Sequence, residues 1–159
     1  MRWTARSNTA TASRPRRYAV LAAHGGAGAT TVLGLLTLAY SGNDNLEVVE
    51  LTTDSPLPAS AEPVLVTRSS AAGLGAAARV LATWNPSHAQ PWFVVMADAP
   101  AKPSFPARYR RRVLSGQVRS VIDLPFLWPL RAVDQVSDAA SSRSVLRAAC
   151  ALRDALEKG

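Results

Sequence analysis

Hydrophobic residues in this chain fall into short continuous runs that alternate with longer segments of helical spacing. The runs are five to seven residues long and rich in valine and leucine, which is typical of buried strands. Strands are expected at 17–23, 46–51, 63–68, 92–96 and 118–124. Helices are expected at 30–40, from a cap at Ser69 or Ser70 to Trp84, at 106–115, and from Ser141 or Ser142 onward.

The last predicted helix has one apolar face. Val145, Ala149, Leu152 and Leu156 recur at spacings of three and four and therefore share one side of the helix. We expect Cys150 to pack on the inner side of this helix as well. It is the single cysteine of the chain, which excludes an intramolecular disulfide.

The alternation of strands and helices predicts an α/β fold. Parallel strands joined by helices form a sheet that is covered on both faces, and the crossovers are right-handed. We expect three layers: a mostly parallel sheet of about five strands with helices on both faces. The 159 residues and the 48% hydrophobic content suit one domain with a sizeable core, which we place at 17–159.

A glycine-rich turn joins the first strand to the first helix. Its sequence is His24-Gly25-Gly26-Ala27-Gly28-Ala29-Thr30-Thr31. Glycines allow successive backbone N–H groups to point at an anion, and the N-terminus of the following helix adds its positive end. This order of strand, glycine loop and helix is that of a phosphate-binding loop. The lysine that normally reaches the phosphates is absent, because that position is Ala29.

The turn resembles the deviant Walker A loop of the MinD/ParA family of P-loop ATPases, Lys-Gly-Gly-x-Gly-Lys-Thr-Thr. His24 and Ala29 stand at the two lysine positions. The matching positions are Gly25, Gly26, Gly28, Thr30 and Thr31. The chain is also similar to small uncharacterised bacterial proteins with the same lysine-free loop. The resemblance implies a P-loop-like fold and places Thr30 at the magnesium-ligand position.

The segment 52–63 departs from the same family. The MinD/ParA ATPases have a further strand ending in an aspartate at this point, whereas 52–63 contains Asp54 with no apolar run before it. Loss of two lysines and of this segment removes the electrostatic stabilisation that phosphoryl transfer requires. We therefore interpret the chain as a catalytically degenerate P-loop NTPase-like domain with a binding or regulatory role. Weak binding of phosphate, or of ATP or ADP with Mg²⁺, by residues 24–31 stays open.

Two enzyme hypotheses stand beside this interpretation. An active ATPase of the MinD/ParA type would use His24 and Thr30 in an unusual way. A dinucleotide-binding protein is the weaker alternative: Gly26-Ala27-Gly28-Ala29-Thr30-Thr31 is an incomplete Gly-x-Gly-x-x-Gly motif, and Glu50 stands where the ribose-binding acid is expected.

Two further segments are candidate contacts for a ligand. Asp98 follows the strand at 92–96, and α/β sheets bind ligands at the carboxyl ends of their strands. The apolar segment 124–131 contains Phe126 and Trp128 and corresponds to a loop that passes near the base in the resembling ATPases. These aromatic side chains are candidates for stacking on a ligand, for packing as a lid, or for a protein interface.

The net charge of +7 is unevenly distributed. Residues 1–17 contain five arginines and no acid, so we interpret 1–16 as a disordered basic arm. Arg108, Arg111 and Arg112 share one side of the predicted helix at 106–115. Together with the arm, this patch suggests a third hypothesis, a DNA-associated accessory protein that contacts phosphates.

The remaining features of the composition bear on the source of the protein, its location in the cell and its metal sites. Sixteen of the 18 basic residues are arginine, which points to a GC-rich bacterial genome. No apolar run approaches the roughly 20 residues of a membrane span, and no secretory h-region follows Arg2. We expect a cytoplasmic protein with an unidentified protein partner. Two histidines and one cysteine without ligand spacing offer no metal site besides Thr30 with a bound nucleotide.

Overall fold

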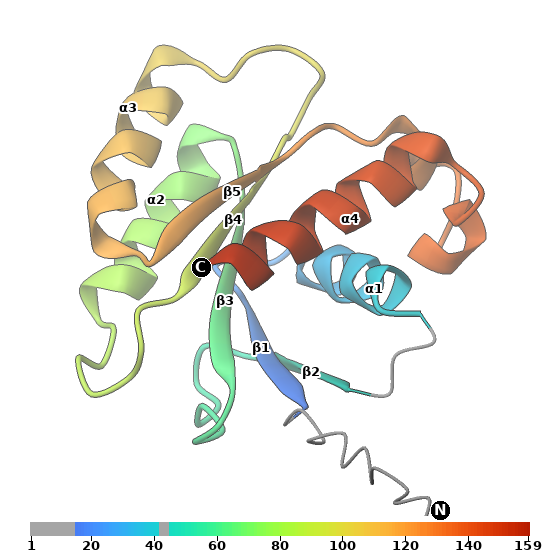
Figure 1. Cartoon of the computed structure of the whole chain (residues 1–159). Coiled ribbons are helices and arrows are strands. Elements are labelled where there is room, and N and C mark those ends of the chain that lie inside the picture. Colours follow the sequence, from blue (N-terminus) through green and yellow to red (C-terminus); the bar gives the residue numbers. More distant parts are fainter. Residues whose placement is uncertain (1–14, 42–44) are drawn as a thin grey trace, which may run out of the picture.

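The computed structural model describes residues 15–41 and 45–159. Over this part of the chain it is a three-layer α/β structure around one five-stranded sheet. All neighbouring strands are parallel, in the spatial order β2-β1-β3-β4-β5 (Figure 1). The strands are β1 (Arg16–Ala22), β2 (Leu46–Leu51), β3 (Glu62–Arg68), β4 (Trp92–Met96) and β5 (Ser120–Leu124).

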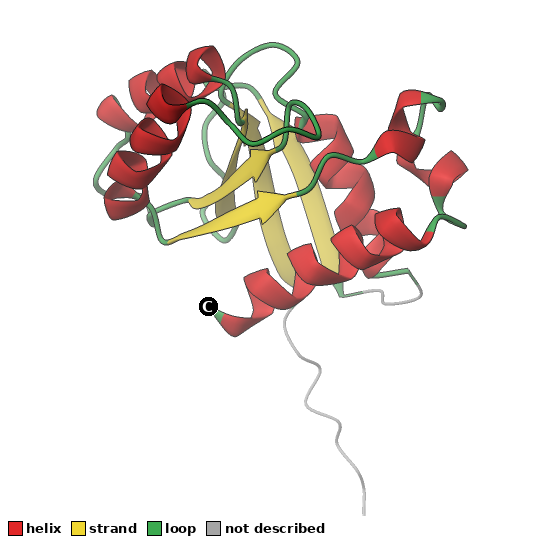
Figure 2. Cartoon of the chain, turned by 90° about the horizontal axis from the view of Figure 1, so that it is seen from above, coloured by secondary structure: helices red, strands yellow, loops and turns green. Residues whose placement is uncertain are grey.

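Helices cover both faces of the sheet (Figure 2). One face carries α1 (Ala29–Ala39) and α4 (Arg143–Lys158), and the other carries α2 (Ala71–Ala82) and α3 (Phe105–Leu114). Three short 3₁₀ turns complete the described elements: η1 (Ser115–Gln117), η2 (Trp128–Arg131) and η3 (Val136–Ala139). The α/β class, the parallel sheet and the helices on both faces are thus confirmed.

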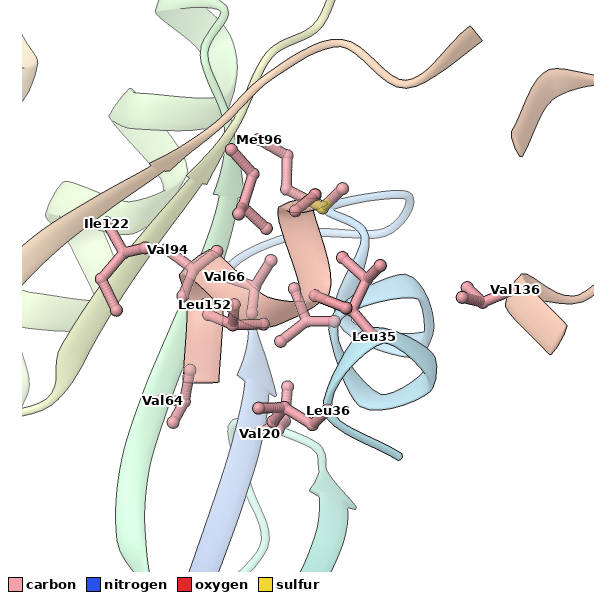
Figure 3. Packing of buried hydrophobic residues seen from close by; sticks show 14 of the residues in the cluster. Val20, Leu35, Leu36, Val64, Val66, Val94, Met96, Ile122, Val136 and Leu152 are labelled. Carbon is pink, nitrogen blue, oxygen red and sulfur yellow. The ribbon is translucent and has the colours of Figure 1, made fainter. Parts of the chain in front are cut away.

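Side chains of each central strand alternate between two hydrophobic cores, because successive strand residues point to opposite faces. Val64 and Val66 of β3 pack with Leu35 and Leu152 on the α1 and α4 side (Figure 3). Leu65, between them, packs in the second core with residues of α2 and α3. β3 and β4 are buried on both faces, which is why their sequences read as continuous apolar runs.

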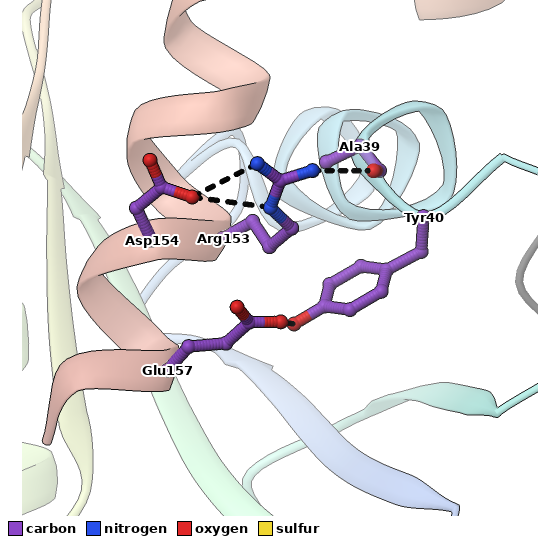
Figure 4. A network of polar contacts seen from close by, with 5 residues as sticks. All are labelled: Ala39, Tyr40, Arg153, Asp154 and Glu157. Carbon is purple, nitrogen blue, oxygen red and sulfur yellow. Dashed lines mark hydrogen bonds and ion pairs between the residues drawn. The ribbon is translucent and has the colours of Figure 1, made fainter.

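Polar contacts fix α4 against the end of α1 (Figure 4). The Tyr40 hydroxyl donates to Glu157 Oε1 at 2.8 Å, and Arg153 donates to the Ala39 carbonyl at 3.3 Å. The same guanidinium pairs with Asp154. Because the last carbonyls of a helix have no partner within it, the arginine satisfies one that would otherwise depend on water.

The predicted helix starts agree with the structure, with small differences at other ends. Ser70 caps α2, accepting from the Gly73 N–H at 3.1 Å, and α4 begins after Ser142. Arg16, which we assigned to the basic arm, is the first residue of β1 and pairs with Leu46. Residues 1–14 of the expected arm lie outside the described residues.

The prediction for Cys150 was wrong. Its thiol is exposed, whereas Ala149 beside it is fully buried. Consecutive helix residues are separated by about 100°. The buried stripe of α4 runs through Val145, Ala149, Leu152 and Leu156, so the next residue after Ala149 turns away from the sheet.

Candidate functional site at the carboxyl edge of the sheet

The glycine-rich turn lies at the point where the strand order reverses. β2 lies on one side of β1, and β3, β4 and β5 follow on the other. In doubly wound sheets, ligands bind outside the carboxyl ends of the strands at this switch point. The turn leaves the carboxyl end of β1, and Ala23 N–H donates to the Val66 carbonyl of β3 at 2.9 Å. The strand order therefore puts the turn at the edge that favours ligand binding.

Two glycines give the turn its path. Gly26 and Gly28 have φ of 75° and 101°, in the left-handed region that favours glycine. A Cβ at Gly28 would also collide with Met96 Sδ, whereas one at Gly25 would meet nothing within 4 Å. Gly28 is therefore required by the packing, while Gly25 and Gly26 leave open space in front of the turn.

The first N–H groups of α1 are available as donors. Val32 N–H donates to the Gly28 carbonyl at 2.9 Å, which is the first helical hydrogen bond. Within the described residues, the N–H groups of Ala29, Thr30 and Thr31 have no such acceptor. These unpaired groups and the helix dipole favour an anion at this end of α1.

The position of the missing lysine faces the core. Ala29 is 4% exposed and belongs to the core under α1, and Ala27 is 1% exposed. In the structure, the side chain of residue 29 is therefore part of the core and contributes no charge in front of the turn.

His24 is engaged by the protein itself. Its Nδ1 lies 2.8 Å from the Gly25 carbonyl, and its Nε2 lies 3.4 Å from the Arg68 N–H. These partners assign the tautomer in which Nδ1 donates and Nε2 accepts. A Cβ at Gly73 would lie 3.1 Å from Nε2, so the imidazole is also enclosed by the start of α2. His24 thus connects the glycine turn to the end of β3, and both of its ring nitrogens have a partner within the protein.

Thr30 contacts an acid that the sequence suggested for a different role. Its hydroxyl donates to Glu50, with Oγ1 3.3 Å from each carboxylate oxygen. Both residues are exposed. Glu50 was considered only as the ribose-binding acid of a dinucleotide protein. In the structure it lies beside the residue expected to hold magnesium.

Two arginines that the sequence analysis did not select flank the start of α1. Arg68 and Arg131 line a pocket of about 120 Å³ together with Thr31. Arg68 Nε donates to the Gly26 carbonyl at 3.0 Å, which holds its guanidinium beside the turn. The usable signal was the position of Arg68 at the carboxyl end of β3, since parallel neighbours end at the same edge.

The aromatic segment forms the outer wall of this pocket. Phe126 and Trp128 contact each other edge to face at 4.9 Å between centroids, and Arg131 lies 5.3 Å above the Phe126 ring. Phe126 lines the pocket, whereas Trp128 is 65% exposed. The segment 124–131 is therefore placed next to the glycine turn, and Phe126 is the aromatic side chain that faces the pocket.

The other predicted site residues lie apart from the turn. Asp98 is exposed, its N–H donates to Ser69 Oγ at 3.0 Å, and it lines neither the arginine pocket nor the larger one beneath α3. Arg108, Arg111 and Arg112 do share one side of α3. Arg111 pairs with Asp123 through Nε at 2.8 Å from Oδ1, so one charge of the patch is neutralised.

Comparisons with known proteins give a fold and no family. No protein-family model matches the chain, and no curated protein sequence is significantly similar to it. Among solved structures, an oxidoreductase from Corynebacterium diphtheriae, determined by X-ray crystallography, superposes with a TM-score of 0.53. The two share 14% identity over 92% of this chain and 100% of that chain, a likeness that shows the fold alone. No helix of the described residues is long and apolar enough to cross a membrane.

Proposed function

We propose that the protein binds a phosphate-bearing small molecule, of the nucleotide class, at the glycine turn and does not hydrolyse it. In this role the chain is a binding or regulatory domain whose glycine turn resembles that of the MinD/ParA ATPases. The observation that carries the proposal is the position of Arg68 and Arg131, which line one pocket with Thr31 at the N-terminus of α1.

Arg68 and Arg131 supply positive charge in place of the two missing lysines. A guanidinium binds phosphate oxygens through paired donors, and it keeps its charge at any physiological pH. The free N–H groups of Ala29, Thr30 and Thr31 add uncharged donors on the neighbouring side. Phe126 lines the same pocket beneath the Arg131 guanidinium and adds an apolar surface for the rest of the ligand.

The same geometry argues against turnover. Phosphoryl transfer depends on cations placed to stabilise charge on the transferred group. Ala29 is buried, and both ring nitrogens of His24 are occupied, so neither lysine position supplies a cation to the turn. We therefore assign binding without hydrolysis to this site.

A magnesium ion would fit at the turn next to the bound phosphates. The Thr30 hydroxyl and the Glu50 carboxylate are adjacent oxygen donors, the type of ligand that Mg²⁺ prefers together with substrate phosphates. When bound, the ion would neutralise part of the phosphate charge next to Glu50. In the structure, the hydrogen bond between Thr30 and Glu50 keeps these two oxygen donors next to each other.

Isothermal titration of the full chain with ATP, ADP and GTP in the presence of Mg²⁺ tests the proposal. We expect saturable binding that weakens at least about tenfold in the double variant Arg68→Gln/Arg131→Gln, because two charge-assisted contacts are lost. The matched control is Arg143→Gln/Arg147→Gln, which removes the same charge from exposed positions on α4. Equal affinity in the two double variants, or no heat with any nucleotide, would contradict the proposal.

A dinucleotide ligand is the second candidate. Glu50 is the second-last residue of β2 and lies beside the turn, near the position from which an acid accepts a hydrogen bond from a ribose hydroxyl in dinucleotide-binding folds. The structural neighbour named an oxidoreductase has the same general fold. Adding NAD⁺ to the titration panel separates the candidates: a dinucleotide site binds NAD⁺ more tightly than ADP, and Glu50→Gln weakens it.

A further inference from the structure

A second pocket lies on the other side of the same sheet edge, beneath α3. It has a volume of about 520 Å³, within the range of 300–1,000 Å³ that is typical of small-molecule sites. Its walls come from the carboxyl ends of β4 and β5, from Ser69 directly after β3, from Leu74 of α2 and from the adjoining side of α3. It contains neither Arg68 nor Arg131 and shares only Ala97 with the pocket at the glycine turn.

The floor of this pocket is apolar and firmly held. Leu74 and Ala107 are 1% exposed, and Val95 is 3% exposed. All three side chains belong to the core under α2 and α3, whereas the side chain of Leu124, which borders the pocket, belongs to the core on the other face. Because these side chains are fixed by packing on their other sides, the floor keeps its shape without a ligand.

Arginines form the rim. Arg108, Arg111 and Arg112 line the pocket from one side of α3. Arg111 is held by Asp123 across the opening, and this pairing raises its pKa further above the ordinary value. Arg108 and Arg112 are exposed, and within the described residues their guanidinium groups have no hydrogen bond or ion pair. Two unpaired charges thus stand over an apolar floor.

Arg110, on the same helix, has a different role. Its Nη1 donates to the Ala71 carbonyl at 2.7 Å and so fastens α3 to the start of α2. A Cβ at Gly75 would lie 3.1 Å from this atom, so the small residue leaves room for the contact. Arg108 and Arg112 are therefore carried on a helix that is held by other contacts, those of Arg110 and Arg111.

We infer that this pocket binds a small amphipathic anion, with its apolar part on the floor and a carboxylate or phosphate group between Arg108 and Arg112. The apolar floor favours a ligand with a hydrocarbon body, and the unpaired guanidinium groups select its charge. A nucleic-acid backbone would use the arginines but would leave the apolar floor unoccupied. The inference does not depend on nucleotide binding at the glycine turn.

Isothermal titration with four probes tests the two requirements separately. Octanoate and octyl phosphate carry both an apolar chain and a charge, 1-octanol carries the chain alone, and inorganic phosphate carries the charge alone. We expect the two amphipathic anions to bind at least about tenfold more tightly than either single-feature probe. Equal binding of octanol would overturn the role of the arginines, and equal binding of inorganic phosphate would overturn the role of the floor.

Variants then locate the binding. Arg108→Gln/Arg112→Gln should weaken octanoate at least about tenfold, whereas Arg143→Gln/Arg147→Gln, with the same spacing on α4, should leave it unchanged. Neither pair makes a side-chain hydrogen bond or ion pair within the described residues, so folding should be little affected. Equal weakening by both pairs would contradict the site, because it would indicate a general charge effect.

Methyl NMR supplies a readout that does not depend on the variants. Octanoate should shift the methyl signals of Leu74, Val95 and Ala107 and leave those of Val145 and Leu152, in the core under α4, unchanged. Shifts confined to other methyl groups, or tighter binding of a DNA duplex with no response to octanoate, would overturn the assignment.

Discussion

The hydroxyl of Thr30 donates to the carboxylate of Glu50, and Oγ1 lies 3.3 Å from both carboxylate oxygens. Thr30 is in the first turn of α1, and Glu50 lies near the end of β2. The contact places a negative charge beside the N–H groups that we assign to phosphate binding. A phosphate and this carboxylate repel each other unless a cation lies between them. The contact thus predicts how nucleotide binding depends on magnesium.

Chelation of magnesium should weaken ATP binding to the wild-type chain. In Glu50→Gln the repulsion is absent, so binding without magnesium should be tighter than in the wild type, and the effect of the ion should shrink. Titrations with Mg²⁺ and with EDTA measure both. Glu47→Gln is the control, since Glu47 is on the same strand and pairs with Arg17 away from the turn. A magnesium effect of unchanged size in Glu50→Gln would contradict the assignment.

Restoring the family's lysine by Ala29→Lys should not produce ATPase activity. Ala29 is 4% exposed, so the variant buries an ammonium group in the core and should lose about 2 kcal/mol or more of unfolding free energy. Chemical denaturation measures the loss, and phosphate release measures turnover. Ala72→Lys adds the same side chain at an exposed site in the first turn of α2 and should be close to neutral. Turnover by a stable Ala29→Lys protein would show that the buried position is not restrictive.

The contact between Gly28 and Met96 predicts a coupled effect on stability. Gly28→Ala combines a φ of 101° with a collision at Met96 Sδ and should cost about 1–3 kcal/mol. In a Met96→Ala background the cost should be smaller, because only the backbone strain remains. Gly116→Ala, where a Cβ meets nothing within 4 Å, serves as the control. The same cost in both backgrounds would exclude the steric part.

The link between Tyr40 and Glu157 predicts how stability changes in alkali. Burial and the hydrogen bond to Glu157 raise the pKa of Tyr40 well above its ordinary value of about 10. The stability that this provides is complete below pH 10 and is lost as the pH rises from there toward the higher pKa of the folded state. The unfolding free energy of the wild type should therefore fall more steeply above pH 10 than that of Tyr40→Phe.

Denaturation curves between pH 8 and 11.5 test this slope. Tyr109→Phe is the matched control, because Tyr109 is 63% exposed on α3. Its pH dependence should follow the wild type. Parallel curves for wild type and Tyr40→Phe would mean that the hydroxyl is not protected by the fold.

The sequence predicts this fold well where local chemistry decides it. The apolar run Val64-Leu65-Val66 indicates a strand buried on both faces, and Ser70 indicates the start of α2 through its capping hydroxyl. Strand order is different, because nothing local to β2 or β3 shows that both neighbour β1. The prediction that Cys150 packs inside was wrong, because Cys150 is one residue beyond the buried Ala149. The apolar spacing alone does not show on which side of the helix such a neighbouring residue lies.

The sequence predicts where the glycine turn lies, but not which charged residues surround it. The glycine turn can be recognised in the sequence because phosphate-binding loops need glycine between a strand and a helix. Arg68 and Arg131 are 63 residues apart in the sequence. The folding of the chain around the sheet brings them to one pocket with Thr31. The contact of Thr30 with Glu50 likewise spans two elements. Contacts of this kind depend on the strand order, so they are not visible in the sequence.

Binding and turnover measured on one sample test the central claim most directly. The full chain is titrated calorimetrically with ATP and Mg²⁺, and the recovered complex is then assayed for released phosphate over many hours. We predict a saturable heat with one nucleotide per chain and no release above the rate in buffer. Release that disappears in His24→Ala would contradict the claim and support an active ATPase. Absence of heat would contradict it from the other side, because it would make the turn a structural feature of the fold alone.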